Sequence, residues 1–177
     1  MIRRYAIALF CTVLSLALAG VALAKNGRAV AKADFNGQTV SIDYGRPSLH
    51  GRTITQMLGE LKPGGFWRLG ADSSTTFTTG VDLKFGDVTV PKGTYSLWAQ
   101  RVSENSWKLV FNTSHGMWGT MHSKYLSDDK YFVPLTETKA ASPQDLVTIT
   151  INKEGDNGGV IDIVWGDLEL AAHFTTS

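Results

Sequence analysis

Apolar and polar residues alternate along much of the chain, and Gly, Asn, Asp and Pro interrupt the alternation at short intervals. Successive side chains of a β-strand point to opposite faces, so a period of two predicts strands with one buried face. The pattern is clearest in Thr94–Gln100, with Tyr95, Leu97 and Ala99, and in Ser106–Asn112, with Trp107, Leu109 and Phe111. We therefore expect a hairpin that places Leu97 opposite Phe111. The same register places Trp98 on the outward face, opposite Val110.

Two further hairpins follow from turn residues and alternation. Asn36-Gly37 is typical of a type I′ turn, which requires positive φ at both central residues. The expected partners about this turn are Ala33 with Val40, Ala31 with Ile42, and Ala29 with Tyr44. Across the turn at residues 153–158, the expected partners are Val147 with Trp165, Ile149 with Ile163, and Ile151 with Ile161.

The remaining elements are shorter. Strands are expected at Phe66–Leu69, Thr75–Thr79, Val81–Phe85, Val88–Val90, Tyr131–Thr138 and Leu168–Phe174. Apolar residues at helical spacing from Ile54 to Leu61 predict one or two helical turns before Pro63. Thr113–Lys130 is expected to be a long irregular segment. The sequence thus predicts an all-β fold, an antiparallel β-sandwich or barrel-like sandwich of about ten strands with one short helix.

The first 24 residues have the pattern of a secretory signal peptide. Arg3 and Arg4 precede an apolar run, and Ala22-Leu23-Ala24 is typical of a cleavage site. The run is too short to span a bilayer, which takes about 20 apolar residues. We therefore expect an exported protein, periplasmic or extracellular, with a single domain over residues 25–177 and no membrane span after cleavage.

Composition narrows the range of partners. Arg3 and Arg4 are two of the 17 basic residues, so the chain after residue 24 has 15 basic against 16 acidic residues, a formal charge of −1. Nucleic-acid binding is not expected, because it requires a basic excess on one face. The single cysteine, Cys11, lies within the predicted signal, so the domain is expected to fold without disulfides.

Four segments carry a resemblance to a known family. They are residues 40–54 (VSIDYGRPSLHGRTI), 66–76 (FWRLGADSSTT), 91–98 (PKGTYSLW) and 107–112 (WKLVFN) followed by Trp118-Gly119. In this order they resemble the bacterial domain of unknown function 2911 family. The resemblance implies an exported bacterial β-rich domain and brings no activity, cofactor or catalytic residue. Asp72 departs from the family pattern, in which an Asn is expected.

Polar and aromatic residues near strand ends form the candidate ligand-binding set. Arginines there could bind a carboxylate or sugar hydroxyls while carboxylates accept hydrogen bonds, and tryptophans could provide an apolar platform. The set comprises Asp43, Tyr44, Arg46, Trp67, Arg68, Asp72, Trp98, Asn112 and Trp118. The alternative interpretation is structural, with Arg–Asp pairs tying loops to the sandwich and the tryptophans packed in it.

Signatures of catalysis and metal binding are weak. Histidines 50, 115, 122 and 173 lack the short regular spacing of zinc ligands, although His122 could converge with Asp128 and Asp129. There is no Gly-x-Ser-x-Gly motif, and no cofactor or metal is expected. We therefore expect a non-catalytic binding module for a small polar or carbohydrate-like ligand, with a small molecule, glycan or protein as partner. The alternatives are an envelope structural or interaction protein, and an envelope hydrolase that uses Asp43 or Asp72.

Overall fold

The computed structural model describes residues 27–59 and 61–177. The predicted signal peptide, residues 1–24, lies outside the described residues. The elements in chain order are β1 (Arg28–Phe35), β2 (Gln38–Gly45), α1 (Ile54–Leu58), β3 (Phe66–Trp67), β4 (Thr75–Thr79), β5 (Leu83–Phe85), β6 (Val88–Val90), β7 (Gly93–Ser103), β8 (Ser106–Asn112), the 3₁₀ turns η1 (His122–Lys124) and η2 (Leu126–Asp128), β9 (Asp129–Glu154) and β10 (Gly158–Thr176).

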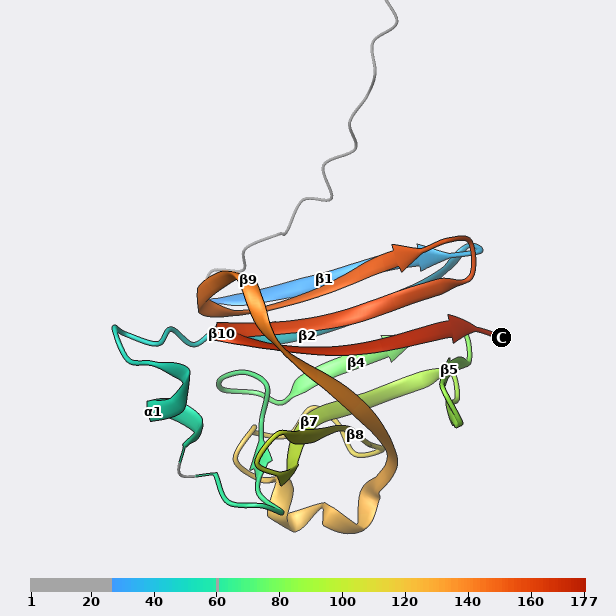
Figure 1. Ribbon diagram of the computed structural model, residues 1–177. Helices are drawn as coiled ribbons and strands as arrows, with labels where there is room; N and C mark the ends of the chain where they lie inside the picture. The colour runs from blue at the N-terminus through green and yellow to red at the C-terminus, as the bar shows by residue number, and fades with distance from the viewer. Residues whose placement is uncertain (1–26, 60) are drawn as a thin grey trace, which may run out of the picture.

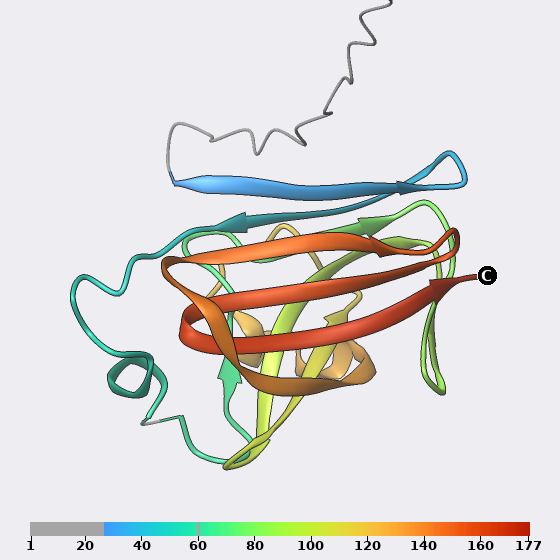
Figure 2. The same ribbon diagram turned by 45° about the horizontal axis from the view of Figure 1, so that its top comes forward.

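The ten strands form one antiparallel sheet in the order β1-β2-β4-β7-β8-β9-β10-β5-β6, with β3 paired to β7 beyond the end of β4. The sheet curls into two facing layers, and β9 crosses diagonally from one layer to the other (Figure 1). Figure 2 shows β1 at the margin of the upper layer. Because β1 and β6 end the order of strands, the sheet does not close into a barrel. The predicted all-β class is confirmed.

The predicted hairpins form, and all but one of the expected cross-strand pairs are present. Leu97 lies opposite Phe111, and Trp98 lies opposite Val110. At the first hairpin Ala33 lies opposite Val40, and the turn residues Asn36 and Gly37 have φ of 50° and 79°. In the last hairpin Ile149 pairs with Ile163 and Ile151 pairs with Ile161, but the expected pair of Val147 with Trp165 is wrong, because the register shifts between Val164 and Gly166. Local alternation and turn chemistry therefore specify these pairings.

The core lies between the layers and is built from the inward apolar residues of the strands. Aromatic rings meet edge to face at its centre, with 5.2 Å between the centroids of Phe77 and Phe111 and 5.3 Å between those of Phe35 and Phe174. This geometry suits the charge distribution of aromatic rings. Each such ring stabilises the fold by about 1.5–3 kcal/mol through burial.

Several strand bounds differ from the sequence prediction. β3 ends at Trp67 because the chain leaves the extended region at Leu69, which has a φ of 53°. The strand predicted at residues 131–138 continues through β9 to Glu154, and the last two predicted strands merge into β10. Gly166, with a φ of 60°, bends β10 where its register with β9 shifts. β10 thus bends at a glycine instead of stopping.

The short helix forms where apolar spacing predicted it. Thr53 caps α1, because its side chain accepts a hydrogen bond from the Gln56 amide while the Gln56 side chain accepts from the Thr53 amide. None of the five helical residues is fully buried. Across residues 27–59 and 61–177, no helix is long and apolar enough to cross a bilayer.

Candidate functional site

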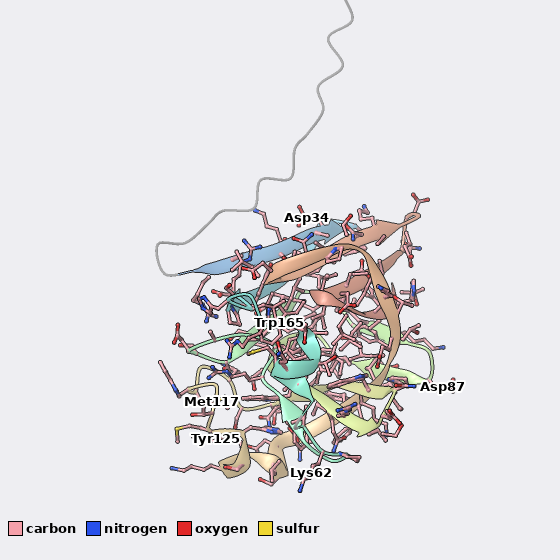
Figure 3. All side chains as sticks on the ribbon, turned by 60° about the vertical axis from the view of Figure 1, so that its left-hand side comes forward. Asp34, Lys62, Asp87, Met117, Tyr125 and Trp165 are labelled. Atoms are coloured by element: carbon pink, nitrogen blue, oxygen red, sulfur yellow. The ribbon has the colours of Figure 1, made fainter. Side chains whose placement is uncertain are left out.

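A cavity of about 480 Å³ lies between α1 and the outward face of β7. Four parts of the chain line this cavity. The α1 side contributes Met57, Leu58 and Leu61, and β3 with the residue after it contributes Phe66, Trp67 and Arg68. Trp98 comes from β7, and Gly119, Thr120 and His122 come from the segment after β8. Figure 3 turns the α1 side of the molecule forward, with Met117 and Tyr125 marking the segment after β8 on that side. The lining thus joins apolar side chains from α1 to aromatic and cationic groups from the sheet.

Trp98 faces outward as predicted, but it is only 2% exposed. His122 covers its indole ring in a stacked arrangement, with 4.4 Å between centroids and 21° between the ring planes. The ring of Phe66 meets His122 edge-on at 4.4 Å. Trp98 is therefore the floor of the cavity and not an exposed surface residue, because the segment after β8 folds back over it.

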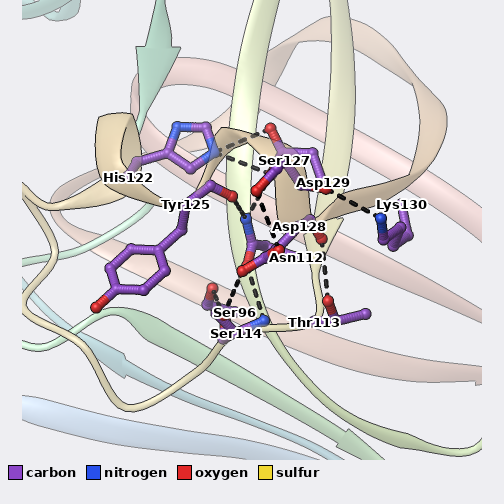
Figure 4. A network of polar contacts seen from close by, with 10 residues as sticks. All are labelled: Ser96, Asn112, Thr113, Ser114, His122, Tyr125, Ser127, Asp128, Asp129 and Lys130. Carbon is purple, nitrogen blue, oxygen red and sulfur yellow. Dashed lines mark hydrogen bonds and ion pairs between the residues drawn. The ribbon is translucent and has the colours of Figure 1, made fainter.

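His122 and Asp129 form a buried pair behind this lining. Nε2 of His122 lies 2.9 Å from Oδ1 and 3.0 Å from Oδ2 of Asp129 (Figure 4). The two side chains are 8% and 6% exposed. A carboxylate that contacts one ring nitrogen fixes the orientation of the imidazole. The second ring nitrogen points away from the carboxylate in Figure 4.

Asn112 fixes Asp129 in turn. Its Nδ2 donates to Oδ1 of Asp129 at 2.7 Å and to the carbonyl of Tyr125 at 2.8 Å. Its Oδ1 accepts from the amide of Ser114 at 2.9 Å. Asn112 is fully buried, so one amide side chain ties the end of β8 to β9 and to the segment over the cavity.

Arg68 reaches the cavity beside a close backbone contact. The amide of Gly119 donates to the carbonyl of Asp72 at 2.7 Å, and a Cβ at Gly119 would lie 2.8 Å from that carbonyl oxygen and 3.3 Å from Cδ of Arg68. Only glycine allows this approach without displacing the backbone or the arginine. Within the described ranges the Arg68 guanidinium forms no ion pair.

A second cavity of about 480 Å³ begins at Ile54 and extends along Glu137, Lys139 and Asp167. Its charged groups already have partners: Lys139 lies 4.0 Å from Asp167, and Glu137 accepts from Nε1 of Trp107 at 2.7 Å. The cavity above Trp98 combines apolar walls with a cation, which is the usual character of a small-molecule site. It is therefore the stronger candidate.

The structure gathers only part of the predicted set at this cavity. Trp67, Arg68 and Trp98 line it, and Asn112 supports it from behind. Trp67 stacks on Trp165 at 5.6 Å and is 6% exposed, whereas Trp118 is 52% exposed and outside the lining. The three tryptophans therefore do not form one exposed platform.

The other members of the set lie elsewhere. Asp43 is bound by Arg28 at 2.7 Å, and the hydroxyl of Tyr44 donates to the carbonyl of Ile149. Arg46 donates to the carbonyl of Val147 at 3.0 Å. Asp72 is exposed. Neither Asp43 nor Asp72 lines the cavity, so the contacts of Asp43, Tyr44 and Arg46 follow the structural interpretation.

Of the three residues weighed as a metal site, His122 and Asp129 meet, but Asp128 does not join them. Asp128 accepts from the hydroxyl of Ser114 at 2.6 Å, away from His122. The part of the chain that the structure describes contains no group of three His, Cys, Asp or Glu residues placed to hold a metal. Sequence reasoning missed the α1 side of the cavity, although the helical spacing of Met57, Leu58 and Leu61 was the available signal.

The fold and the cavity define an all-β domain with a pocket between α1 and the outward face of β7. A family model described as a protein of unknown function (DUF2911) matches residues 27–174. The chain therefore belongs to this family, as the sequence resemblance indicated. No curated protein and no solved structure matches the chain.

Proposed function

We propose that the protein is a binding module that holds a small molecule in the cavity between α1 and Trp98. The observation that carries this proposal is the lining itself, which combines three apolar side chains of the α1 side and three aromatic rings with the polar groups of Arg68, Thr120 and His122. Small-molecule sites commonly combine such apolar walls with a few polar groups that orient the ligand. The expected ligand has an apolar body and a polar head group.

The affinity expected for a minimal ligand guides the experiment. Burying an apolar body the size of a phenyl ring contributes about 1.5–3 kcal/mol, and a hydrogen bond to a charged group contributes about 1.5–3 kcal/mol more. A total of about 3–6 kcal/mol corresponds to a Kd between roughly 10 mM and 0.05 mM. Titrations with simple probes should therefore extend to millimolar concentrations.

The first test uses the neutral probe 2-phenylethanol, with methyl glucoside as a carbohydrate-like comparison. Tryptophan fluorescence should shift on addition of 2-phenylethanol, because Trp67 and Trp98 line the cavity. Thr120→Trp should abolish the shift, since Thr120 is an exposed lining residue and an indole there fills the entrance. Ser123→Trp is the matched control, an exposed position on the same segment outside the lining.

Either of two outcomes would count against the binding module. One is a folded wild-type protein that responds to neither probe up to millimolar concentration. The other is a response that Thr120→Trp leaves unchanged, because the probe then binds elsewhere.

We also propose that this binding takes place outside the cytoplasm, in the periplasm or beyond it. The support is the signal-peptide pattern of residues 1–24. N-terminal sequencing of protein recovered from the exported fraction should begin at Lys25. Recovery of an uncleaved chain in the cytoplasm would contradict the proposal.

A further inference from the structure

The two nitrogens of His122 have different surroundings. Nε2 faces the carboxylate of Asp129, which in its ionised form only accepts hydrogen bonds, so Nε2 carries the ring proton. The hydrogen bonds of the ring within residues 27–59 and 61–177 are those of Nε2 with Asp129, and His122 is one of the residues that line the cavity. A neutral His122 therefore presents an unprotonated nitrogen, and a protonated His122 presents a second donor.

Charge in the cavity is unbalanced. Arg68 is permanently charged, and the described lining residues include no carboxylate. Arg68 and Asp129 are the charged groups that line the cavity beside His122 or contact its ring. The neighbouring charges are directed elsewhere: Asp128 contacts Ser114, Lys130 donates to the carbonyl of Ser127, and Lys124 is exposed.

We propose that the ligand of this cavity is a small monocarboxylate with an apolar body, and that its binding takes up one proton at Nδ1 of His122. The inference rests on the proposed function. The ligand carboxylate accepts hydrogen bonds from Arg68 and from the newly protonated Nδ1. The proton comes from solvent, and the imidazolium then lies between two carboxylates, that of Asp129 and that of the ligand.

The ligand carboxylate, the carboxylate of Asp129 and the proton on His122 stabilise one another. An opposite charge within about 4–6 Å stabilises a charged group, so Asp129 on one side and the ligand on the other stabilise the imidazolium. Charge-assisted hydrogen bonds are roughly twice as strong as neutral ones. Burial of His122 between Trp98 and Phe66 keeps water away from the pair, which strengthens the attraction. A neutral amide of the same shape can still accept a hydrogen bond from Arg68, but it lacks the charge that attracts the guanidinium and the imidazolium.

The test compares phenylacetate with phenylacetamide by isothermal titration calorimetry. Phenylacetate should bind at least about 10-fold more tightly, the loss expected for one hydrogen bond to a charged group. Arg68→Gln should weaken phenylacetate binding by about 10- to 100-fold and phenylacetamide binding by less, because the amide is uncharged. Lys124→Gln, which removes an exposed charge of the same sign, is the matched control and should change neither affinity.

Proton uptake is measured by repeating the phenylacetate titration at pH 7.5 in buffers of different ionisation enthalpy. The wild-type protein should take up close to one proton per ligand, and His122→Gln and Asp129→Asn should take up none. Affinity for phenylacetate should also fall as pH rises, because the proton required at His122 becomes scarcer. Asp129→Asn keeps one side-chain oxygen for His122 and Asn112, so it serves if His122→Gln does not fold.

The outcomes separate this inference from the proposed function. Equal affinity for the acid and the amide, blocked by Thr120→Trp, would overturn carboxylate selection and leave the cavity as a binding site. Tight phenylacetate binding without proton uptake would overturn the role of His122. If Thr120→Trp fails to reduce binding of phenylacetate, phenylacetamide or 2-phenylethanol, the inference and the proposed function fall together.

Discussion

Removing the carboxylate of Asp129 tests how the segment over the cavity is held. Asp129 accepts from Nε2 of His122 at 2.9 Å and from Nδ2 of Asn112 at 2.7 Å. Asp129→Ala deprives both buried donors of this acceptor. Asp128→Ala is the matched control, since the neighbouring carboxylate is half-buried and accepts from the hydroxyls of Ser114 and Ser127.

The expected loss of stability follows from the number of buried hydrogen-bond donors that lose their acceptor. A buried donor without a partner costs about 1–3 kcal/mol, so Asp129→Ala should lower the free energy of unfolding by about 2–6 kcal/mol. Asp128→Ala should cost about 1 kcal/mol, because its partners are hydroxyls that can reach water. Asp129→Asn should lie between the two, since the amide oxygen still accepts.

Equilibrium urea unfolding followed by tryptophan fluorescence measures these differences. With a slope of about 2 kcal/mol per molar urea, Asp129→Ala should lower the midpoint by at least about 1 M. Asp128→Ala should lower it by about 0.5 M at most. The reasoning is refuted if the two alanine variants unfold at the same urea concentration, because Asp129 would then not be the buried acceptor described above.

Three further predictions concern the fold. Leu97→Ala removes a fully buried side chain of the central hairpin and should lower the free energy of unfolding in urea by about 2–5 kcal/mol. Val102→Ala, at a side chain that is 41% exposed, should change it by no more than about 0.5 kcal/mol. Equal losses of stability would contradict the assigned register. Gly37→Ala should cost about 1–2 kcal/mol, because a φ of 79° is unfavourable for a side chain even though open space surrounds the position; no loss in urea would exclude the type I′ turn. Burial and the neighbouring Tyr131 raise the pKa of Tyr95 above its ordinary value of 10.0. The neutral phenol of Tyr95 therefore stabilises the folded state fully below pH 10, and this stabilisation is lost as pH rises through the higher pKa of the folded state. Thermal unfolding from pH 9 to 12 should show a shallower alkaline fall for Tyr95→Phe, and parallel curves would contradict this.

The hairpins could be predicted because the information that specifies them is local. Alternation over a few residues of each strand places Leu97 opposite Phe111, and Asn36 with Gly37 supplies a turn that fits the sheet twist. The curl of the sheet into two layers, and the bend of β10 at Gly166, depend on contacts between distant strands. Alternation carries no information about such contacts.

The covering of Trp98 shows where local reasoning ends. Its strand and face were predicted correctly, yet its exposure depends on His122, which lies 24 positions further along the chain in an irregular segment. That segment is held by Asp129 and by the backbone contact of Gly119 with Asp72. Neither contact follows a periodic pattern, so the sequence could suggest the residues without assembling them.

The candidate site was predicted in part for the same reason. Trp67 and Arg68 are adjacent in the chain, so their common position at the end of β3 was predictable. Arg46 was grouped with them because it also follows a strand, but it donates instead to the backbone of Val147 on β9. Residue type identified possible ligand groups, and only the three-dimensional arrangement separated those facing the cavity from those tying the sheet together.

The most direct test of the cavity is a nuclear Overhauser experiment on the protein with saturating phenylacetate. Cross-peaks should connect the ring protons of the ligand with the methyl groups of Met57, Leu58 and Leu61, which form the α1 side of the cavity. Exposed Val30 and Leu146, which do not belong to this lining, should show none. Cross-peaks to Val30 or Leu146 in place of the α1 methyl groups would contradict the account.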